Sequence, residues 1–80
     1  MSGLVKDCDD LGYFVRMTRK DNGMTQTQLA DKASVGLRFV SEMERGKETA
    51  QLACVLRVLD ALGVQLQITS KRHSSNNLRR

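Results

Sequence analysis

The sequence predicts one small, mainly α-helical domain, in which four short helices are followed by a single β-strand. Apolar residues recur at helical spacing in four stretches, and Gly or Asn residues separate these stretches. Residues 64–69 instead alternate between apolar and polar side chains, which is the pattern of a half-buried strand. A chain of 80 residues forms one domain with a modest core, and domains of this size often gain stability by forming oligomers.

The N-terminal part predicts a loose segment followed by a first helix. Residues 1–9 show no periodicity, whereas the next residues place apolar or small side chains at i, i+3, i+4 and i+7: Leu11, Phe14, Val15 and Thr18. Asp9 or Asp10 can cap the start of this helix. Asn22-Gly23 ends it, because Gly readily adopts the positive φ of a helix C-terminus.

Residues 24–47 predict two short helices joined by a tight turn. Thr25 is a suitable N-cap, and Gln28 stands three residues later, which is the capping-box spacing. The first of these helices has one apolar face formed by Leu29, Ala30 and Ala33, and the turn spans residues 33–36. Gly46 ends the second helix. In a helix-turn-helix of this kind, the second helix can enter the major groove of DNA.

The C-terminal part predicts a fourth helix, a strand and a polar tail. Thr49 is a candidate cap, Gly63 ends the helix, and the apolar stripe between them consists of Leu52, Val55, Leu56, Leu59 and Leu62. One face of the strand at 64–69 carries Val64, Leu66 and Ile68. A single strand lacks ladder partners, so we expect it to pair with its copy in a second chain and form a dimer. Residues 70–80 are polar and basic and are expected to be disordered.

The charge distribution and the cysteine content limit which functions the sequence can support. The net charge of +4 comes from Lys71, Arg72, Arg79 and Arg80, because residues 1–70 contain nine basic and nine acidic residues. A DNA-binding surface must therefore depend on how charge is distributed over the fold. Cys8 and Cys54 form no CxxC motif and the lone histidine, His73, lies in the tail, so no metal site and no cofactor are predicted. Cys54 is expected in the core.

No apolar stretch is long enough to span a membrane and no signal peptide is evident, so we expect a reduced cytoplasmic protein without membrane contacts. If the helix-turn-helix binds DNA, we expect the protein to be associated with the nucleoid when it is bound to its operator. The sequence also contains no cluster of His, Glu, Arg or Tyr that suggests a catalytic site. We therefore predict that the protein is not an enzyme.

The helix-turn-helix resembles that of the Xre/Cro/C1-type regulators over about residues 11–68. These proteins have Leu-Thr-Gln near the start of the first motif helix and Ser-x-x-Glu-x-Gly-Lys at the end of the second. This chain has Met24-Thr25-Gln26 and then Ser41-Glu42-Met43-Glu44-Arg45-Gly46-Lys47. Residues 36–42 are most similar to the HipB-type antitoxins. The resemblance implies a four-helix lambda-repressor-like fold and a sequence-specific repressor.

The outward face of the second motif helix contains the candidate base-reading residues, namely Leu37, Arg38, Ser41 and Glu42. Arg38 can donate twice to guanine O6 and N7, and Ser41 can donate or accept at a base edge. Leu37 can touch a thymine methyl group. Glu42 either accepts from a cytosine amine or holds Arg38 in place. Phe39 lies either at the edge of this surface or at the margin of the core.

The candidate phosphate-binding residues flank that helix. Gln26 stands at a helix N-terminus, where free N–H groups and a side-chain amide suit an anion. Arg45 and Lys47 follow the second motif helix and are suited to non-specific phosphate contacts. Thr49, with the start of the fourth helix, can contribute similarly. For all these residues the alternative interpretation is an ordinary solvated surface.

The family resemblance implies further roles. Arg19 and Glu44 match a partly buried ion pair that fixes the second motif helix against the first helix of the domain. HipB-type proteins are similar in having a short strand that joins two chains, which implies a homodimer and an inverted-repeat operator in double-stranded DNA. If the likeness extends to function, this protein is the antitoxin of a HipA-like kinase toxin and represses their shared operon. The alternatives are a solitary Xre-family regulator and a protein-interaction module that has lost DNA binding.

Overall fold

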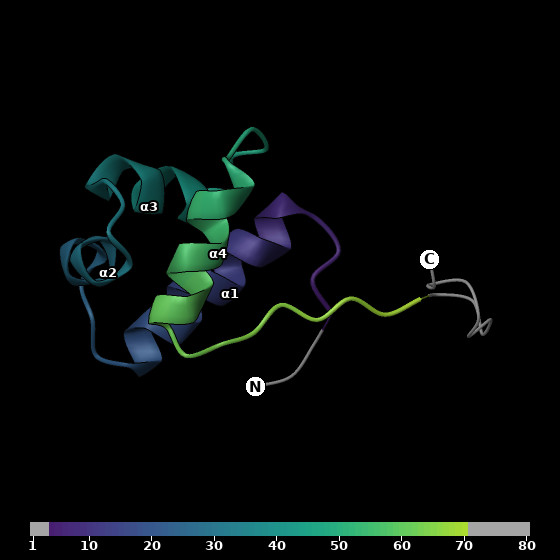
Figure 1. Ribbon diagram of the computed structural model, residues 1–80, viewed down its shortest axis with the longest axis horizontal. Coiled ribbons are helices and arrows are strands. Elements are labelled where there is room, and N and C mark those ends of the chain that lie inside the picture. The colour runs from purple at the N-terminus through teal and green to yellow at the C-terminus, as the bar shows by residue number, and fades with distance from the viewer. Residues whose placement is uncertain (1–3, 71–80) are drawn as a thin grey trace.

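The computed structural model describes residues 4–70, and within that range the chain forms four α-helices (Figure 1). They are α1 (Cys8–Asp21), α2 (Gln26–Ala33), α3 (Leu37–Glu44) and α4 (Leu52–Ala61). Helix α2 packs against both α3 and α4, and α1 packs against α3. The mainly helical fold predicted from the sequence is therefore present. The basic tail at 71–80, which includes His73, lies outside the described residues.

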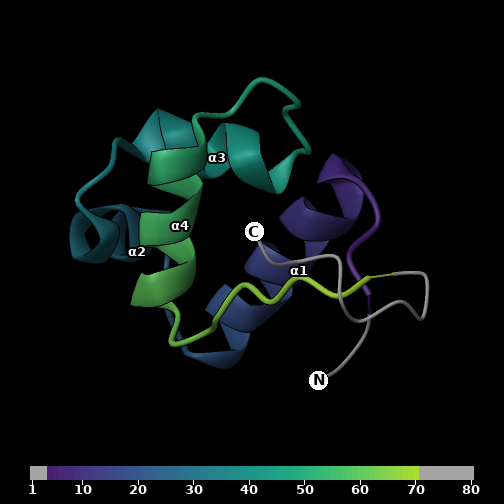
Figure 2. The ribbon, with the colours of Figure 1, turned by 45° about the vertical axis from the view of Figure 1, so that its right-hand side comes forward.

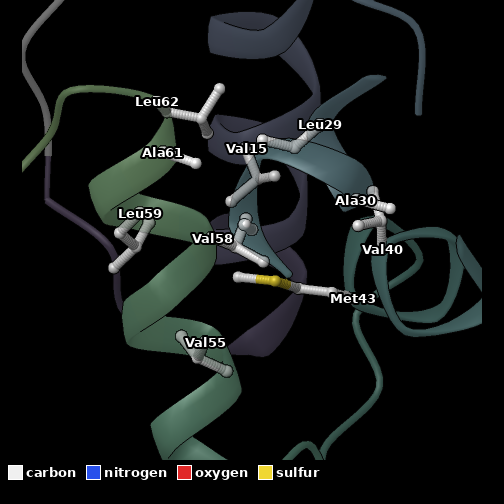
Figure 3. Close-up of a cluster of buried hydrophobic side chains, with 11 residues drawn as sticks. Val15, Leu29, Ala30, Val40, Met43, Val55, Val58, Leu59, Ala61 and Leu62 are labelled. Atoms are coloured by element: carbon white, nitrogen blue, oxygen red, sulfur yellow. The ribbon is translucent and has the colours of Figure 1, made fainter. Parts of the chain in front are cut away.

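The hydrophobic core forms where the four helices meet. Val15 of α1, Leu29 of α2 and Val58 of α4 are completely buried. Figure 3 shows Val15, Val58 and Met43 of α3 pointing toward one another, with Leu29 beside them. Helices α2 and α3 have only eight residues each, and helices of that length are marginal in water. Their stability therefore comes from this shared packing.

Helix α1 begins earlier than the sequence suggested. The backbone N–H of Asp10 donates to Oδ1 of Asp7 at 2.8 Å, so Asp7 is the N-cap. The expectation that Asp9 or Asp10 caps the helix was wrong, because both lie in its first turn. There their negative carboxylates interact favourably with the positive end of the helix dipole. Cys8 and Asp9 thus belong to α1 instead of a loose N-terminal segment.

The capping box predicted for α2 is present. Thr25 Oγ1 accepts from the backbone N–H of Gln28 at 3.0 Å, and the Thr25 N–H donates to Gln28 Oε1 at 2.9 Å. The helix ends at Ser34, a non-glycine residue with φ of 58°. Gly36 is the N-cap of α3 and provides no side-chain cap, and α3 is followed by Gly46 with φ of 87°.

Helix α4 differs from its prediction in two respects. Its N-cap is Gln51 and not Thr49, and no side-chain hydrogen bond caps this end. Its buried side also lies further round the helix than predicted. The residues that face the core are Val55, Val58, Leu59, Ala61 and Leu62, whereas Leu52 and Leu56 are exposed. Cys54 is not a core residue, because it is only partly buried, and its Sγ lies 3.5 Å from Gln51 Oε1.

Residues 64–70 follow Gly63, whose φ of 75° ends α4, and they form an extended segment that crosses α1 in the view of Figure 2. Val64 packs at the margin of the core, whereas Leu66 and Ile68 are exposed. Residues 4–70 contain no strand. A strand needs a ladder partner, which a single chain does not supply here, so the dimer-forming strand at 64–69 stays a prediction.

Candidate nucleic-acid interface

Helix α3 has an inward and an outward face. Val40 and Met43 are buried on the inward face. The four residues predicted to read bases share the outward face, where Leu37 and Arg38 are exposed and Ser41 and Glu42 are half-buried. The Arg38 side chain is 88% exposed, so most of its guanidinium donors face solvent. Phe39 packs against the core, which places it at the core margin.

The inward face of α3 ends at a buried ion pair with α1. Nε of Arg19 lies 2.6 Å from Oε2 of Glu44, and Nη2 donates to Oε1 at 3.0 Å. The remaining nitrogen, Nη1, donates to the backbone carbonyl of Met24 at 2.8 Å. The two side chains are only 9% and 3% exposed. Arg19 thus binds the Glu44 carboxylate with two parallel hydrogen bonds and also fixes the start of the helix-turn-helix.

Both members of this pair are ionised at neutral pH. Burial is the largest single influence on Glu44 and by itself raises its pKa, but the hydrogen bonds from Arg19 and Gln26, together with the positive charges of Arg19 and Arg16, hold the pKa below its ordinary value. The hydrogen bond to Glu44 raises the pKa of Arg19, against the opposing effect of burial. The pair is therefore a fixed charge arrangement at the base of α3.

Gln26 has a structural contact that the sequence did not predict. Its Nε2 donates to Oε1 of Glu44 at 3.0 Å, so the side chain at the start of α2 joins the Arg19–Glu44 pair. The start of α2 consequently lies beside the end of α3. No sequence signal would have identified this bond, because it depends on how α2 and α3 cross.

Gly12 permits close contact between α1 and α3, and the sequence analysis missed it. A Cβ at this position would lie 2.5 Å from the carbonyl oxygen of Met43 and 2.7 Å from that of Glu44. Gly12, Val15 and Arg19 are the buried residues of α1, so they form its contact face. A glycine inside an otherwise helical pattern was the signal that could have revealed this contact.

The outward face contains a second, different carboxylate. Glu42 Oε2 lies 3.4 Å from Nε of Arg38, one helical turn earlier, and Oε1 accepts from Nζ of Lys47 at 2.9 Å. The hydrogen bond from Lys47 is the main reason why the pKa of Glu42 lies below its ordinary value. Of the two roles considered for Glu42, its contact with Arg38 is present in the free protein.

Three of the four candidate phosphate-binding residues lie around one end of α3. Arg45 is its C-cap, and Lys47 follows in the loop; both are exposed. Gln26 is at the same end, because it contacts Glu44. Thr49 is exposed in the turn that precedes α4. Gln26, Arg45 and Lys47 therefore lie near the end of α3 opposite to Leu37 and Arg38.

Within residues 4–70, no group of three or more His, Cys, Asp or Glu side chains could hold a metal ion. Both cysteines are free. The same part of the chain contains no helix that is long and apolar enough to cross a membrane.

Comparison with known proteins gives a consistent family. Residues 10–68 match the model of a helix-turn-helix domain family. Over 68 residues, the chain is 44% identical to the uncharacterized HTH-type transcriptional regulator y4mF of Sinorhizobium fredii, covering 85% of this chain and 90% of that protein. It is also 32% identical over 56 residues to the immunity repressor protein of Bacillus phage phi105, covering 70% of this chain and 39% of the repressor.

The fold is similar to that of HipB. The matching structures include a HipB–O4 20mer complex and a HipA–HipB–O2–O3 complex. In each case the TM-score is 0.81 at 20% identity, with 89% of this chain and all of the other chain covered. At this identity the likeness concerns the fold alone.

Proposed function

Because this chain belongs to the helix-turn-helix family of DNA-binding transcriptional regulators, we propose that it is a sequence-specific repressor that binds an inverted-repeat operator as a homodimer. The observation that carries this proposal is the outward face of α3, where Arg38 is almost fully exposed on a helix fixed from behind by the buried Arg19–Glu44 pair. A rigid helix with free donors on its outer side suits insertion into a major groove.

Base reading falls to the outward residues of α3. The exposed guanidinium of Arg38 donates to the O6 and N7 atoms of a guanine, and Leu37 packs on a thymine methyl group. Ser41 and Glu42 face the next bases along the groove. Gln26, Arg45, Lys47 and Thr49 bind phosphates beside the groove and set the orientation of the domain without selecting sequence.

Dimerisation uses the segment after α4. Leu66 and Ile68 are 54% and 85% exposed in the single chain, and these large apolar side chains support a surface that a partner covers. Antiparallel pairing of residues 64–69 with the same segment of a second copy satisfies their backbone groups and generates a twofold axis. The two copies of α3 then enter successive major-groove faces about 34 Å apart, or a multiple of that spacing.

Substitution of Leu66 by Asp tests this dimer. The charge would lie in the apolar seam between the strands, so we expect the Leu66→Asp variant to be a monomer with weak DNA binding. Sedimentation of the wild-type and variant proteins at micromolar concentration gives the oligomeric state. A monomeric wild-type protein, or a variant that stays dimeric, would exclude strand pairing and leave the exposed side of α4 as the dimer surface.

The finer proposal is that the protein is the antitoxin of a HipA-like kinase toxin and represses the operon that encodes both. The support is the likeness of its fold to HipB, which also occurs in a complex with HipA. Purification of the native protein followed by mass spectrometry tests it. Recovery of a kinase-like protein in equal amount supports the antitoxin role, whereas recovery of the chain alone supports a solitary regulator.

Selection from a random double-stranded DNA library tests the DNA-binding proposal itself. We expect the bound fraction to yield an inverted repeat with a guanine in each half-site, contacted by Arg38. Recovery of no preferred sequence would contradict the proposal and favour a protein-interaction module.

A further inference from the structure

We propose that Glu42 enforces sequence specificity by occupying Arg38 and Lys47 unless the DNA offers the correct bases. The inference rests on the proposed function of α3 as a recognition helix. It assigns to Glu42 a role beyond contact with one base, namely lowering affinity for all other sequences.

One carboxylate, that of Glu42, lies between the arginine proposed to read a base and the lysine proposed to bind a phosphate. Glu42 Oε2 lies 3.4 Å from the base-reading Arg38, and Oε1 accepts from the phosphate-binding Lys47 at 2.9 Å. The Glu42 side chain is 28% exposed, and its two contacts place it beside both partners. Any DNA that takes either cation away leaves this carboxylate next to phosphates or to groove acceptors, and that approach is repulsive.

A correct sequence avoids this loss. The contact of Arg38 with Glu42 involves Nε, the Arg38 side chain is 88% exposed, and a guanidinium has five N–H donors. Its terminal nitrogens can therefore bind guanine O6 and N7 while Nε stays on Glu42. Lys47 leaves for a phosphate, and a cytosine or adenine amine in the groove takes its place at Glu42. On an incorrect sequence neither compensation exists.

This role can be tested without unfolding the domain. Glu42 lies on the surface, and exposed ion pairs of this kind contribute little to stability. Glu42→Gln keeps the shape and removes the charge. Glu48→Gln is the matched control, since it removes an equal charge from an exposed position next to Lys47. Binding constants of wild type and both variants are measured on the selected operator and on a scrambled duplex, each over a range of salt concentrations.

We expect Glu42→Gln to bind the scrambled duplex about tenfold more tightly and the operator no more tightly than wild type, because the neutral amide removes the penalty on incorrect sequences and weakens the contact with the base amine. Its salt dependence on the scrambled duplex should steepen by about one to two phosphate contacts, since Arg38 and Lys47 become available. Glu48→Gln should change both affinities by one common factor and leave their ratio unaltered.

Two results would overturn the inference while leaving the proposed function intact. One is an equal change on both duplexes for Glu42→Gln, which would mean a general charge effect. The other is a loss of operator affinity with unchanged scrambled binding, which would make Glu42 a base reader only. A wild-type protein without any preference for the selected operator would instead contradict the proposed function, and this inference with it.

Discussion

Glu42 and Glu44 stand two residues apart on α3, yet their surroundings are opposite. Glu44 is buried and bound by Arg19 and Gln26, from two other parts of the fold. Glu42 lies outside, with partners from its own helix and the loop that follows. The inward carboxylate fixes where α3 lies, and the outward one has partners that can exchange when a ligand arrives. The same charge on one short helix thus has a structural role on one face and a proposed role in recognition on the other.

The largest expected effect follows from removal of Arg19, the buried cation that binds Glu44. Arg19→Ala leaves Glu44 buried without its main partner, so we expect the free energy of unfolding to fall by about 3–5 kcal/mol. Urea denaturation of the variant measures this loss. Arg38→Ala is the control, since removal of an exposed arginine should change stability by less than about 0.5 kcal/mol. Equal losses in both variants would mean that burial of the pair is irrelevant.

Gly12 tests the same inward face through packing. In Gly12→Ala the new Cβ would lie 2.5 Å from the carbonyl oxygen of Met43, so α1 and α3 must move apart. We expect a loss of about 1–3 kcal/mol in the free energy of unfolding, measured by thermal and urea denaturation. Gly36→Ser offers the comparison, because a Cβ at Gly36 meets nothing within 4 Å and φ there is −75°. That variant should retain its stability.

The outward face is tested by DNA affinity. Arg38→Ala should weaken operator binding by about 1–3 kcal/mol and relax the preference at one base step, without destabilising the fold. Lys47→Ala should weaken binding to operator and scrambled duplexes alike and reduce the salt dependence by about one contact. Titrations of both variants on both duplexes separate these effects. A similar loss on the two duplexes for Arg38→Ala would reject base reading by this residue.

Lowering the pH distinguishes the contributions of Glu44 and Glu42 to the free energy of unfolding. Because the folded-state pKa of Glu44 lies below its ordinary value of 4.5, its stabilising effect is complete above 4.5 and disappears as pH falls through the folded pKa. Glu44→Gln should therefore be less stable than wild type at neutral pH, and this difference should shrink in acid. Glu42→Gln should show a much smaller difference at either pH. Unfolding measured between pH 7 and about pH 3 gives the comparison.

Local signals were sufficient to predict the helices and several of their ends. The capping box of Thr25 and Gln28 and the glycine at position 46 depend on residues close in sequence. The start of α1 was mispredicted because Asp7, Asp9 and Asp10 are equally suitable caps by type, and local pattern does not choose among them. For Arg19 and Glu44, the family resemblance located a pair that residue spacing alone would not have joined.

Features that depend on packing between distant elements were harder to predict. Helix α4 is apolar on most of its circumference, so its pattern fits more than one stripe, and Val58 was missed while Leu52 and Leu56 were included. The bond between Gln26 and Glu44 and the contact at Gly12 arise from helix crossings. The strand at 64–69 requires a second chain, so no single-chain structure tests it.

The paired hydrogen bonds from Arg19 to Glu44 have a consequence for how the chain folds during synthesis. Arg19 joins the first helix to a carboxylate 25 residues later in the chain. The hydrophobic core is complete only when Val58 of α4 is in place. Helix α3 has eight residues and no side-chain cap at its start, so it is not stable without these contacts. We therefore expect α3 to be unformed in a chain emerging from the ribosome before α4 has been made. The hydrogen-bonded amides of α3, from Val40 onward, should exchange with solvent only upon global unfolding, so the outward face of α3 forms and is lost together with the whole domain.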